Sequence, residues 1–432
     1  MIRPQRVLAT AALTVGLAGC WPAPGAGPDR RSFNGVEQGI TAANVATFTE
    51  QWTARVGFDG GTPGSPLVPL PAGHPIVSTK GTLFVTTERS AHAFDPSTGV
   101  VRWQRLDGAG FDQTVQQLPG DLIAFGIRSG RSDTGTLVLD ARTGAFAVPP
   151  VRPPLGSTGL VDSVRGSLVA TRATRETGCC LVPQILRVAD IDDPSASWEG
   201  LLSVPGELGP SALTLGDDRV FDAGAGLLDA VPGTGTFGNA VRSFPARSGA
   251  ANCGSLEESS QMHYACAQWI TPLDGTTGTP PVLSSDHTTL YTVSDQGTVY
   301  AIDTTTGAVE WSSSVQAGVL LPPALAYGTL FVPTVTGQLV AVDAADGSVE
   351  WRTAAISEHT VQPAVAGGVV FTGTAVGDVM AFDAHGCGAA TCAELWSDNT
   401  GSRIAGAPAI SLGKVFVGTN DGRLIAYGPS GV

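Results

Sequence analysis

Short runs of apolar residues recur along the chain, and many of them end at a turn that contains Gly, Asp or Asn. In VYAID (299–303) and LVAVD (339–343) the apolar positions are almost unbroken, which is typical of strands buried on both faces. The turns supply the residues that tight hairpins need at positive φ, as in SDQG (294–297), TVTG (334–337), AVGD (375–378) and NDGR (420–423). The pattern therefore predicts an all-β protein made of antiparallel hairpins.

One part of this pattern is repeated with little change. It reads HAFDPSTGVVRW at 92–103, YAIDTTTGAVEW at 300–311 and VAVDAADGSVEW at 340–351. Each clear unit begins with a Pro-containing apolar strand and ends with an Asp, a turn and a Trp, as in residues 280–311. Four antiparallel strands in a unit of roughly 40 to 50 residues are typical of a β-propeller blade.

The number of units predicts the number of blades. Units counted by the position of the repeated Asp are centred on Asp95, Asp140, Asp190, Pro245, Asp303, Asp343, Asp383 and Gly428. The last unit stops before any Trp, and FTEQWTARV (48–56) supplies one near the other end of the chain. We therefore expect an all-β, eight-bladed β-propeller of four-stranded antiparallel blades, closed by this N-terminal strand. Seven blades are the alternative, because the repeat is most degenerate between residues 150 and 270.

The repeated residues have structural roles in this prediction. Asp303 ends a strand and can accept hydrogen bonds from the N–H groups of the turn that follows, while Gly307 relieves the steric cost of turning back. A Trp such as Trp311 buries a large ring with a polar N–H group, which suits the seam between neighbouring sheets. The tryptophans assigned to such seams are Trp52, Trp103, Trp198, Trp269, Trp311, Trp351 and Trp396.

The first residues have the pattern of an export signal. Arg3 and Arg6 form a basic region, and an apolar stretch follows at 7–19. LAGC (17–20) resembles the lipobox of bacterial lipoproteins, which implies cleavage before Cys20 and a lipid on its thiol. The interpretation gives a lipoprotein signal peptide at 1–19, the lipidated Cys with a flexible tether at 20–39, and the propeller domain at 40–432. An ordinary signal peptide with a chance Cys is the alternative.

Charge and hydropathy fit an exported protein held by a lipid. We expect it on the outer side of the bacterial cytoplasmic membrane, or in the periplasm or at the outer membrane of a Gram-negative cell, as a monomer. The net charge is −14 and the lysines are Lys80 and Lys414 alone, so the chain lacks the basic clusters that contact nucleic acid. No window after residue 20 approaches the ~20 apolar residues of a spanning helix.

Six further cysteines fall in close pairs, which predicts disulfides in an exported chain. The pairs are Cys179 with Cys180, Cys253 with Cys266, and Cys387 with Cys392. Zinc is the rival interpretation, but no His or Cys stands at finger-like spacing around these pairs. They are therefore interpreted as local loop staples, and no metal site is predicted.

The pattern Ala301-x-Asp303-x-x-Thr306-Gly307-x-x-x-Trp311 resembles the tryptophan-docking motif of the pyrroloquinoline quinone (PQQ) repeat family. Matches recur, in full or in part, over residues 40–428. The resemblance implies an eight-bladed propeller in which the motif joins the blades and does not touch the quinone. Members of the family differ in function, so the motif alone does not indicate a cofactor.

Two kinds of family member suggest two functions. In quinoprotein alcohol dehydrogenases, PQQ and a calcium ion lie in the propeller funnel under a disulfide between adjacent cysteines, and Cys179 with Cys180 resembles that feature. The cations, calcium ligands and catalytic carboxylate of such a site are not found at matching positions. The other kind is lipid-anchored, non-catalytic lipoproteins such as the BamB type, which bind protein partners. The lipobox fits this second kind.

The sequence contains no catalytic constellation that we can identify. The run DIDDPS (190–195) is interpreted as a turn and not as a calcium site. The histidines have no metal-ligand spacing: His74, His92, His263, His287, His359 and His385. We expect a non-catalytic binding or scaffold module for a protein or envelope partner, with no cofactor. The alternative is a PQQ- and calcium-dependent dehydrogenase that uses the central funnel, and a binder of sugar polymers is a third candidate.

Overall fold

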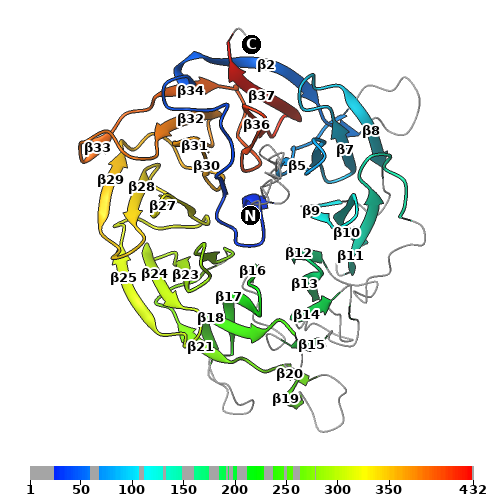
Figure 1. Ribbon diagram of the computed structural model, residues 1–432, viewed down its shortest axis with the longest axis vertical. Helices are drawn as coiled ribbons and strands as arrows, with labels where there is room; N and C mark the ends of the chain where they lie inside the picture. Colours follow the sequence, from blue (N-terminus) through cyan, green and yellow to red (C-terminus); the bar gives the residue numbers. More distant parts are fainter. Residues whose placement is uncertain are drawn as a thin grey trace, which may run out of the picture.

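The chain folds into a ring of β-sheets around a central axis (Figure 1). Eight of the nine sheets in the described part form the blades, which confirms the eight-bladed propeller over the seven-bladed alternative. In each blade the strands are called A to D from the axis outward. The computed structural model describes residues 24–58, 68–106, 111–129, 133–147, 160–174, 184–190, 193, 198–201, 212–227, 237–247, 251–255, 263–277 and 279–430.

Blades 1 to 4 follow one another along the chain. Blade 1 contains β5 (Ile76–Val77), β6 (Leu83–Thr86), β7 (Ser90–Phe94) and β8 (Val101–Leu106). The described strands of blade 2 are β9 (Phe111–Leu118), β10 (Leu122–Ser129) and β11 (Asp133–Asp140). Blade 3 contains β12 (Leu160–Arg165), β13 (Leu168–Thr174), β14 (Gln184–Asp190) and β15 (Trp198–Leu201). Blade 4 contains β16 (Ala212–Leu215), β17 (Arg219–Leu227), β18 (Phe237–Pro245) and β21 (Trp269–Pro272).

Blades 5 to 8 complete the ring. Blade 5 contains β22 (Val282–Leu283), β23 (Thr289–Val293), β24 (Thr298–Asp303) and β25 (Val309–Ser314). Blade 6 contains β26 (Ala324–Ala326), β27 (Thr329–Pro333), β28 (Leu339–Asp343) and β29 (Val349–Thr353). Blade 7 contains β30 (Ala364–Ala366), β31 (Val369–Gly373), β32 (Asp378–Asp383) and β34 (Trp396–Asn399). Blade 8 contains β35 (Ala409–Ser411), β36 (Lys414–Gly418), β37 (Arg423–Pro429) and, from the N-terminal part, β2 (Phe48–Arg55).

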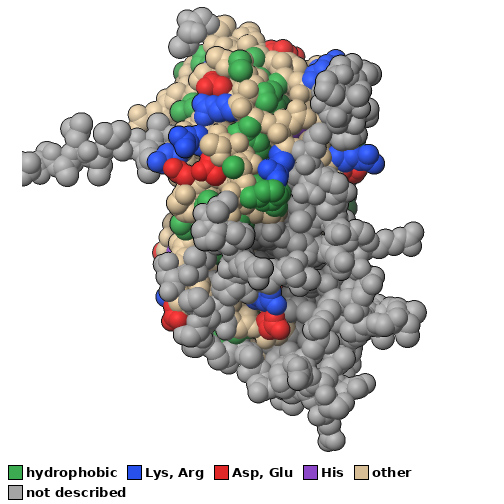
Figure 2. All heavy atoms as spheres, turned by 90° about the vertical axis from the view of Figure 1, so that its right-hand side faces the viewer, with side chains coloured by type: hydrophobic (Ala, Val, Ile, Leu, Met, Phe, Trp, Pro, Cys, Tyr) green, Lys and Arg blue, Asp and Glu red, His purple; other side chains and the backbone are tan. Residues whose placement is uncertain are grey.

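The remaining described elements are short. They are η1 (Pro24–Ala26), β1 (Phe33–Asn34), η2 (Val45–Thr47), β3 (Gly57–Phe58), β4 (Val68–Pro69), β19 (Ala251–Ser255), β20 (His263–Ala265) and β33 (Thr391–Cys392). The helical turns η1 and η2 are the helices of the described part, and neither has the length or apolar character that a bilayer crossing requires. On the side shown in Figure 2, acidic and basic side chains are interspersed over the described surface.

The two ends of the ring carry different turns. The A–B and C–D turns lie at one end, called the A–B face, because antiparallel strands alternate in direction. In blade 5 the Thr304 hydroxyl of the C–D turn donates to the His287 carbonyl of the A–B turn at 2.8 Å, which shows that the two turns are neighbours. The B–C turns and the D–A connections lie at the other end, called the B–C face.

The ring is closed by pairing the two ends of the chain. β2 lies antiparallel to β37, with Thr49 opposite Gly428 and Arg55 opposite Arg423. Trp52 of β2 then donates its indole N–H to the Pro96 carbonyl of blade 1 at 3.1 Å. The prediction that an N-terminal strand completes the last blade is therefore confirmed.

A Trp of one blade packs on a Gly of the next in five seams. A Cβ atom added to the Gly would lie only 2.5–2.7 Å from the Trp ring in Trp269 with Gly307, Trp52 with Gly99, Trp103 with Gly144, Trp311 with Gly347 and Trp351 with Gly386. Trp269 also donates to the Thr304 carbonyl at 2.9 Å. Trp198 packs near Phe244, and Trp396 donates to the Phe48 carbonyl at 3.0 Å.

Gly307→Ala is expected to destabilise the protein more than Gly328→Ala. Both glycines have positive φ, +74° and +82°, so each Ala costs about 1–2 kcal/mol of backbone strain. Only the Gly307 variant also forces a Cβ into the Trp269 ring, which adds about 1–3 kcal/mol of overpacking. Urea unfolding followed by tryptophan fluorescence measures both. Equal shifts of the two midpoints would contradict a tight seam.

The repeated Asp holds the C–D turn as the pattern predicts. The Asp303 carboxylate accepts hydrogen bonds from the Thr306 amide at 2.7 Å, the Thr306 hydroxyl at 2.8 Å and the Thr305 amide at 3.0 Å. The Thr306 hydroxyl and amide bonds are the main reason that the pKa of Asp303 is lowered from its ordinary value. The motif therefore fixes the turn on which the neighbouring Trp packs.

Candidate functional site

Residues 24–34, called the strap, lie against the inner strands at the A–B face. Figure 1 shows this N-terminal segment near the axis of the ring. The strap carbonyls accept hydrogen bonds from three successive blades, from Leu283 to Asp29, from Leu325 to Arg31 and from Val365 to Ser32, at 2.8–2.9 Å. β1 pairs in parallel with β30, and the side-chain amide of Asn34 donates to the Ile410 carbonyl of blade 8 at 2.9 Å. The strap therefore takes up space at one end of the central funnel.

The strap falls in the segment that was expected to be a flexible tether, residues 20–39. Arg30 and Ser32 are 6% and 0% exposed, so this part is packed on the ring, in contrast to that expectation. Gly25 has φ 74°, and its carbonyl accepts a hydrogen bond from the Ser32 amide at 2.8 Å. A Gly- and Pro-rich composition suggests a loose linker, but here Gly25 allows a tight turn.

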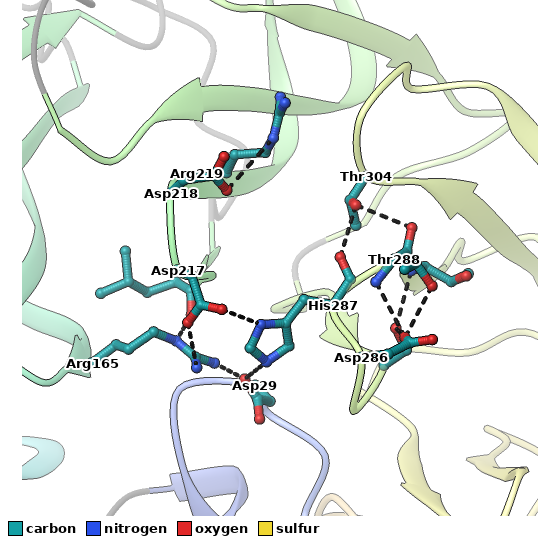
Figure 3. Close-up of polar contacts among 12 residues, drawn as sticks. Asp29, Arg165, Asp217, Asp218, Arg219, Asp286, His287, Thr288 and Thr304 are labelled. Atoms are coloured by element: carbon teal, nitrogen blue, oxygen red, sulfur yellow. Dashed lines mark hydrogen bonds and ion pairs between the residues drawn. The ribbon is translucent and has the colours of Figure 1, made fainter.

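Four side chains, called the latch, join the strap to blades 3, 4 and 5 (Figure 3). Arg165 ends β12, Asp217 lies between β16 and β17, and His287 lies between β22 and β23. Asp29 of the strap pairs with the Arg165 guanidinium and lies 3.4 Å from Nε2 of His287. Asp217 lies 3.1 Å from Arg165 and 2.8 Å from Nδ1 of His287.

Among the known kinds of charged contact, the latch most resembles a partly buried ion pair. The side chains of Arg165 and Asp29 are 20% and 17% exposed, so their attraction is screened less than that of a surface pair. Asp217 is 70% exposed and contributes less to stability. Its pKa is lowered mainly by the hydrogen bond with His287, and burial lowers the pKa of Arg165. Arg165 and His287 each contact both carboxylates, an arrangement that suits holding the strap rather than proton transfer.

Asp29→Ala is expected to loosen the strap and leave the ring folded. The change removes one carboxylate from a partly buried guanidinium, which costs about 1–3 kcal/mol. Hydrogen–deuterium exchange should then be about tenfold faster or more at the amides of Leu283 and Leu325, which donate to strap carbonyls. Asp218→Ala is the matched control, because Asp218 is 82% exposed and lies outside the latch. Equal exchange in the two variants would contradict the role of the latch.

The cysteine predictions fall partly within the described residues. Cys387 and Cys392 form a disulfide with a Cα–Cα distance of 5.6 Å. β33, which contains Cys392, pairs in parallel with β29, so this stapled loop covers the outer edge of blade 6. Cys266 is also disulfide-bonded. The side chain of Cys253 and the residues Cys20, Cys179 and Cys180 lie outside the described part, so their predicted roles stay predictions.

The described histidines lie apart from one another in the fold. His74 accepts a hydrogen bond from the Ala407 amide at 2.8 Å. His92 lies 2.7 Å from the Ser90 hydroxyl, and His359 lies 3.0 Å from the Thr372 hydroxyl. Burial lowers the pKa of both His92 and His359 to about 4. These two are therefore neutral core residues, as expected for scattered histidines.

Stability is expected to fall as the pH is lowered from about 6.5 to 5. In the unfolded chain His92 and His359 take up protons near their ordinary pKa of about 6.5, whereas the folded protein does so only near 4. The unfolded state thus binds more protons in this window, which lowers the free energy of unfolding by about 1–3 kcal/mol. Urea midpoints across this range measure the slope. The double variant His92→Gln/His359→Gln should flatten it, and an unchanged slope would contradict the assignment.

Residues 259–427 match the family model described as outer membrane protein assembly factor BamB, a PQQ-type repeat. The chain is therefore similar to PQQ-type repeats over these residues. This confirms the resemblance of the sequence motif. No curated protein sequence matches the chain.

Solved structures similar to this propeller include both functional kinds. A europium-containing methanol dehydrogenase is 15% identical with a TM-score of 0.65, over 95% of this chain and 98% of the other. A quinohemoprotein alcohol dehydrogenase from Comamonas testosteroni is 14% identical with a TM-score of 0.64, over 96% and 81%. BamB from Moraxella catarrhalis is 14% identical with a TM-score of 0.57, over 88% and 99%. Identities this low establish the shared fold alone.

A PQQ and calcium site needs metal ligands and cations that are free to pair with the quinone carboxylates. Within the described ranges, no group of three or more His, Cys, Asp or Glu side chains is arranged to hold a metal ion. Arg165 reaches the strap at the A–B end of the funnel. Its guanidinium is already paired with Asp29 and Asp217. Quinone carboxylates would have to compete with both of these for the cation.

Proposed function

We propose that this PQQ-like propeller is an exported, lipid-anchored, non-catalytic binding or scaffold module for a protein or cell-envelope partner. The observation that carries the proposal is the strap, whose backbone pairs with blades 5, 6 and 7 and whose Asp29 engages Arg165 of blade 3. The strap occupies one end of the funnel that the alternative function would use. The lipobox-like LAGC (17–20) and the match of residues 259–427 to the BamB family model support the same plan.

A PQQ-dependent dehydrogenase is the alternative, supported by the similarity to a methanol dehydrogenase and to a quinohemoprotein alcohol dehydrogenase. The two functions differ in whether PQQ binds the native state, and a ligand that binds only the native state raises its stability. The test adds PQQ with calcium, and separately PQQ with europium, to the purified full chain. Thermal unfolding and dye-linked oxidation of methanol and ethanol are then measured.

We expect no shift of the unfolding temperature and no alcohol oxidation with either metal. Asp29→Ala is included because it loosens the strap and so exposes any site beneath it. A shift of several degrees with turnover in the parent chain would overturn the proposal. The same result in the Asp29→Ala variant alone would also overturn it, because the strap would then be the lid of an enzyme.

A further inference from the structure

Four exposed aliphatic side chains form an arc on the B–C face, called the apolar rim. They come from blades 5 to 7 and are Leu320, Val335, Ile356 and Val376, with 62%, 39%, 47% and 57% of their surface exposed. Val335 and Val376 lie in the B–C turns of blades 6 and 7, and Leu320 and Ile356 lie in the D–A connections beside them. The strap and latch lie at the opposite end of the ring.

The rim is continuous because its loops are hydrogen-bonded to one another. The Val335 amide donates to the Gly318 carbonyl at 3.0 Å, and the Ile356 amide donates to the Gly337 carbonyl at 3.2 Å. The Ala375 amide, next to Val376, donates to the Glu358 carbonyl at 3.0 Å. The D–A connections therefore lie beside the B–C turns of the blades that they join, and the loops that carry the four side chains are neighbours.

The turn structure gives no reason for apolar residues at these positions. Gly297, Gly337, Gly377 and Gly422 each donate an amide hydrogen bond to the carbonyl three residues earlier, so the B–C turns of blades 5 to 8 are equivalent. The two residues between are Asp295 and Gln296 in blade 5 and Asn420 and Asp421 in blade 8, as turns favour. Blades 6 and 7 have an exposed Val there instead. Contiguous exposed apolar side chains typically mark a site of protein interaction.

The surroundings of the rim indicate the chemistry of the partner. Glu358 is exposed between the loops of Ile356 and Val376, while Arg403 lies beyond the rim toward blade 8. The chain has a net charge of −14, which disfavours an anionic bilayer. Aliphatic side chains offer no hydrogen bonds to the hydroxyl groups of a sugar polymer. A protein segment with apolar anchors and a basic flank matches both features.

We propose that the apolar rim is the docking surface of this protein, and that its partner is a protein segment that presents apolar side chains next to Lys or Arg. The inference rests on the proposed function as a binding module and assigns that function to one face. The two valines alternate with Leu320 and Ile356 along the arc, and a few buried anchors of an interface carry most of the binding.

The test pans a phage-displayed library of random 12-residue peptides against the purified full chain. We expect enriched peptides that combine apolar residues with Lys or Arg. Their affinity for Val335→Asp/Val376→Asp should fall at least tenfold, but less than twofold for Gln296→Asp/Asn420→Asp, which adds the same charges at equivalent turn positions outside the rim. Both variants should keep the urea midpoint of the parent chain, since all four positions are in surface turns.

Peptides that bind the two variants equally, or enriched peptides that are acidic, would overturn the assignment. If the rim variant is destabilised, Leu320→Ser/Ile356→Ser replaces it with the same expectation. Binding of phosphatidylglycerol vesicles that is lost in the rim variant would also overturn it, because the surface would then face lipid. Failure of the rim is distinguishable from failure of the proposed function, because the latter is decided by stabilisation and turnover with PQQ.

Discussion

Replacing β2, Phe48–Arg55, with a Gly-Ser segment of equal length is expected to open the ring and abolish cooperative unfolding. β2 supplies the outer strand of blade 8, and Trp52 packs on Gly99 of blade 1. Phe48 lies 6.2 Å from the ring of Phe371 and 6.1 Å from that of Trp396. Loss of two large aromatic anchors costs about 3–5 kcal/mol each. Together with the strand pairing, this loss is comparable with the 5–15 kcal/mol that stabilises a typical domain.

The matched control replaces β25, Val309–Ser314, which also carries a seam tryptophan but does not join the ends of the chain. Small-angle X-ray scattering and urea unfolding of both variants separate the loss of a strand from the loss of closure. We expect the β25 variant to be destabilised but compact, and the β2 variant to be expanded in buffer. Equal radii of gyration for the two variants would show that closure by β2 is not essential.

Cys20→Ala is expected to move the protein from the membrane fraction to the soluble fraction. A diacylated Cys buries many methylene groups in the bilayer, each worth about 0.8 kcal/mol, so nearly all of the lipidated protein should be membrane-bound. Without the Cys, nearly all of the protein should be in the soluble fraction. Cell fractionation and labelling with a clickable palmitate measure the effect. Cys180→Ala is the control and should stay in the membrane fraction with its label. Retention of the Cys20→Ala protein at the membrane would contradict the lipobox interpretation.

The fold was predictable because its determinants are local and repeated. Asp303, Gly307 and Trp311 lie within one short segment, and each has a role that can be argued from residue type alone. The closing role of Trp52 followed from counting, since one unit lacked a Trp. Repetition thus allowed a long-range contact, β2 with β37, to be predicted without an alignment.

The latch could not be predicted in the same way. Its four residues come from distant segments of the chain: Asp29, Arg165, Asp217 and His287. They are not part of the repeated motif, so no regular spacing in the sequence connects them. The strap itself was misjudged because a Gly- and Pro-rich composition is shared by linkers and by tight turns. Only the pairing of its carbonyls with the inner strands distinguishes the two.

The apolar rim could be predicted from the sequence only in part. The turns TVTG (334–337) and AVGD (375–378) were recognised as hairpin turns, and the exposed valines within them were visible in the sequence. Their significance depends on two facts that the sequence does not contain. Neighbouring loops bring the valines together with Leu320 and Ile356, and the valines remain exposed in the folded ring.

The strap also determines how the protein would stand on a membrane. Pro24, where the described chain begins, is four residues from Cys20, a separation that spans at most about 14 Å when fully extended. A lipid on Cys20 would therefore hold the A–B face close to the bilayer and restrict tilting of the ring. The apolar rim would then face the aqueous compartment, turned toward partners and away from the lipid that anchors it.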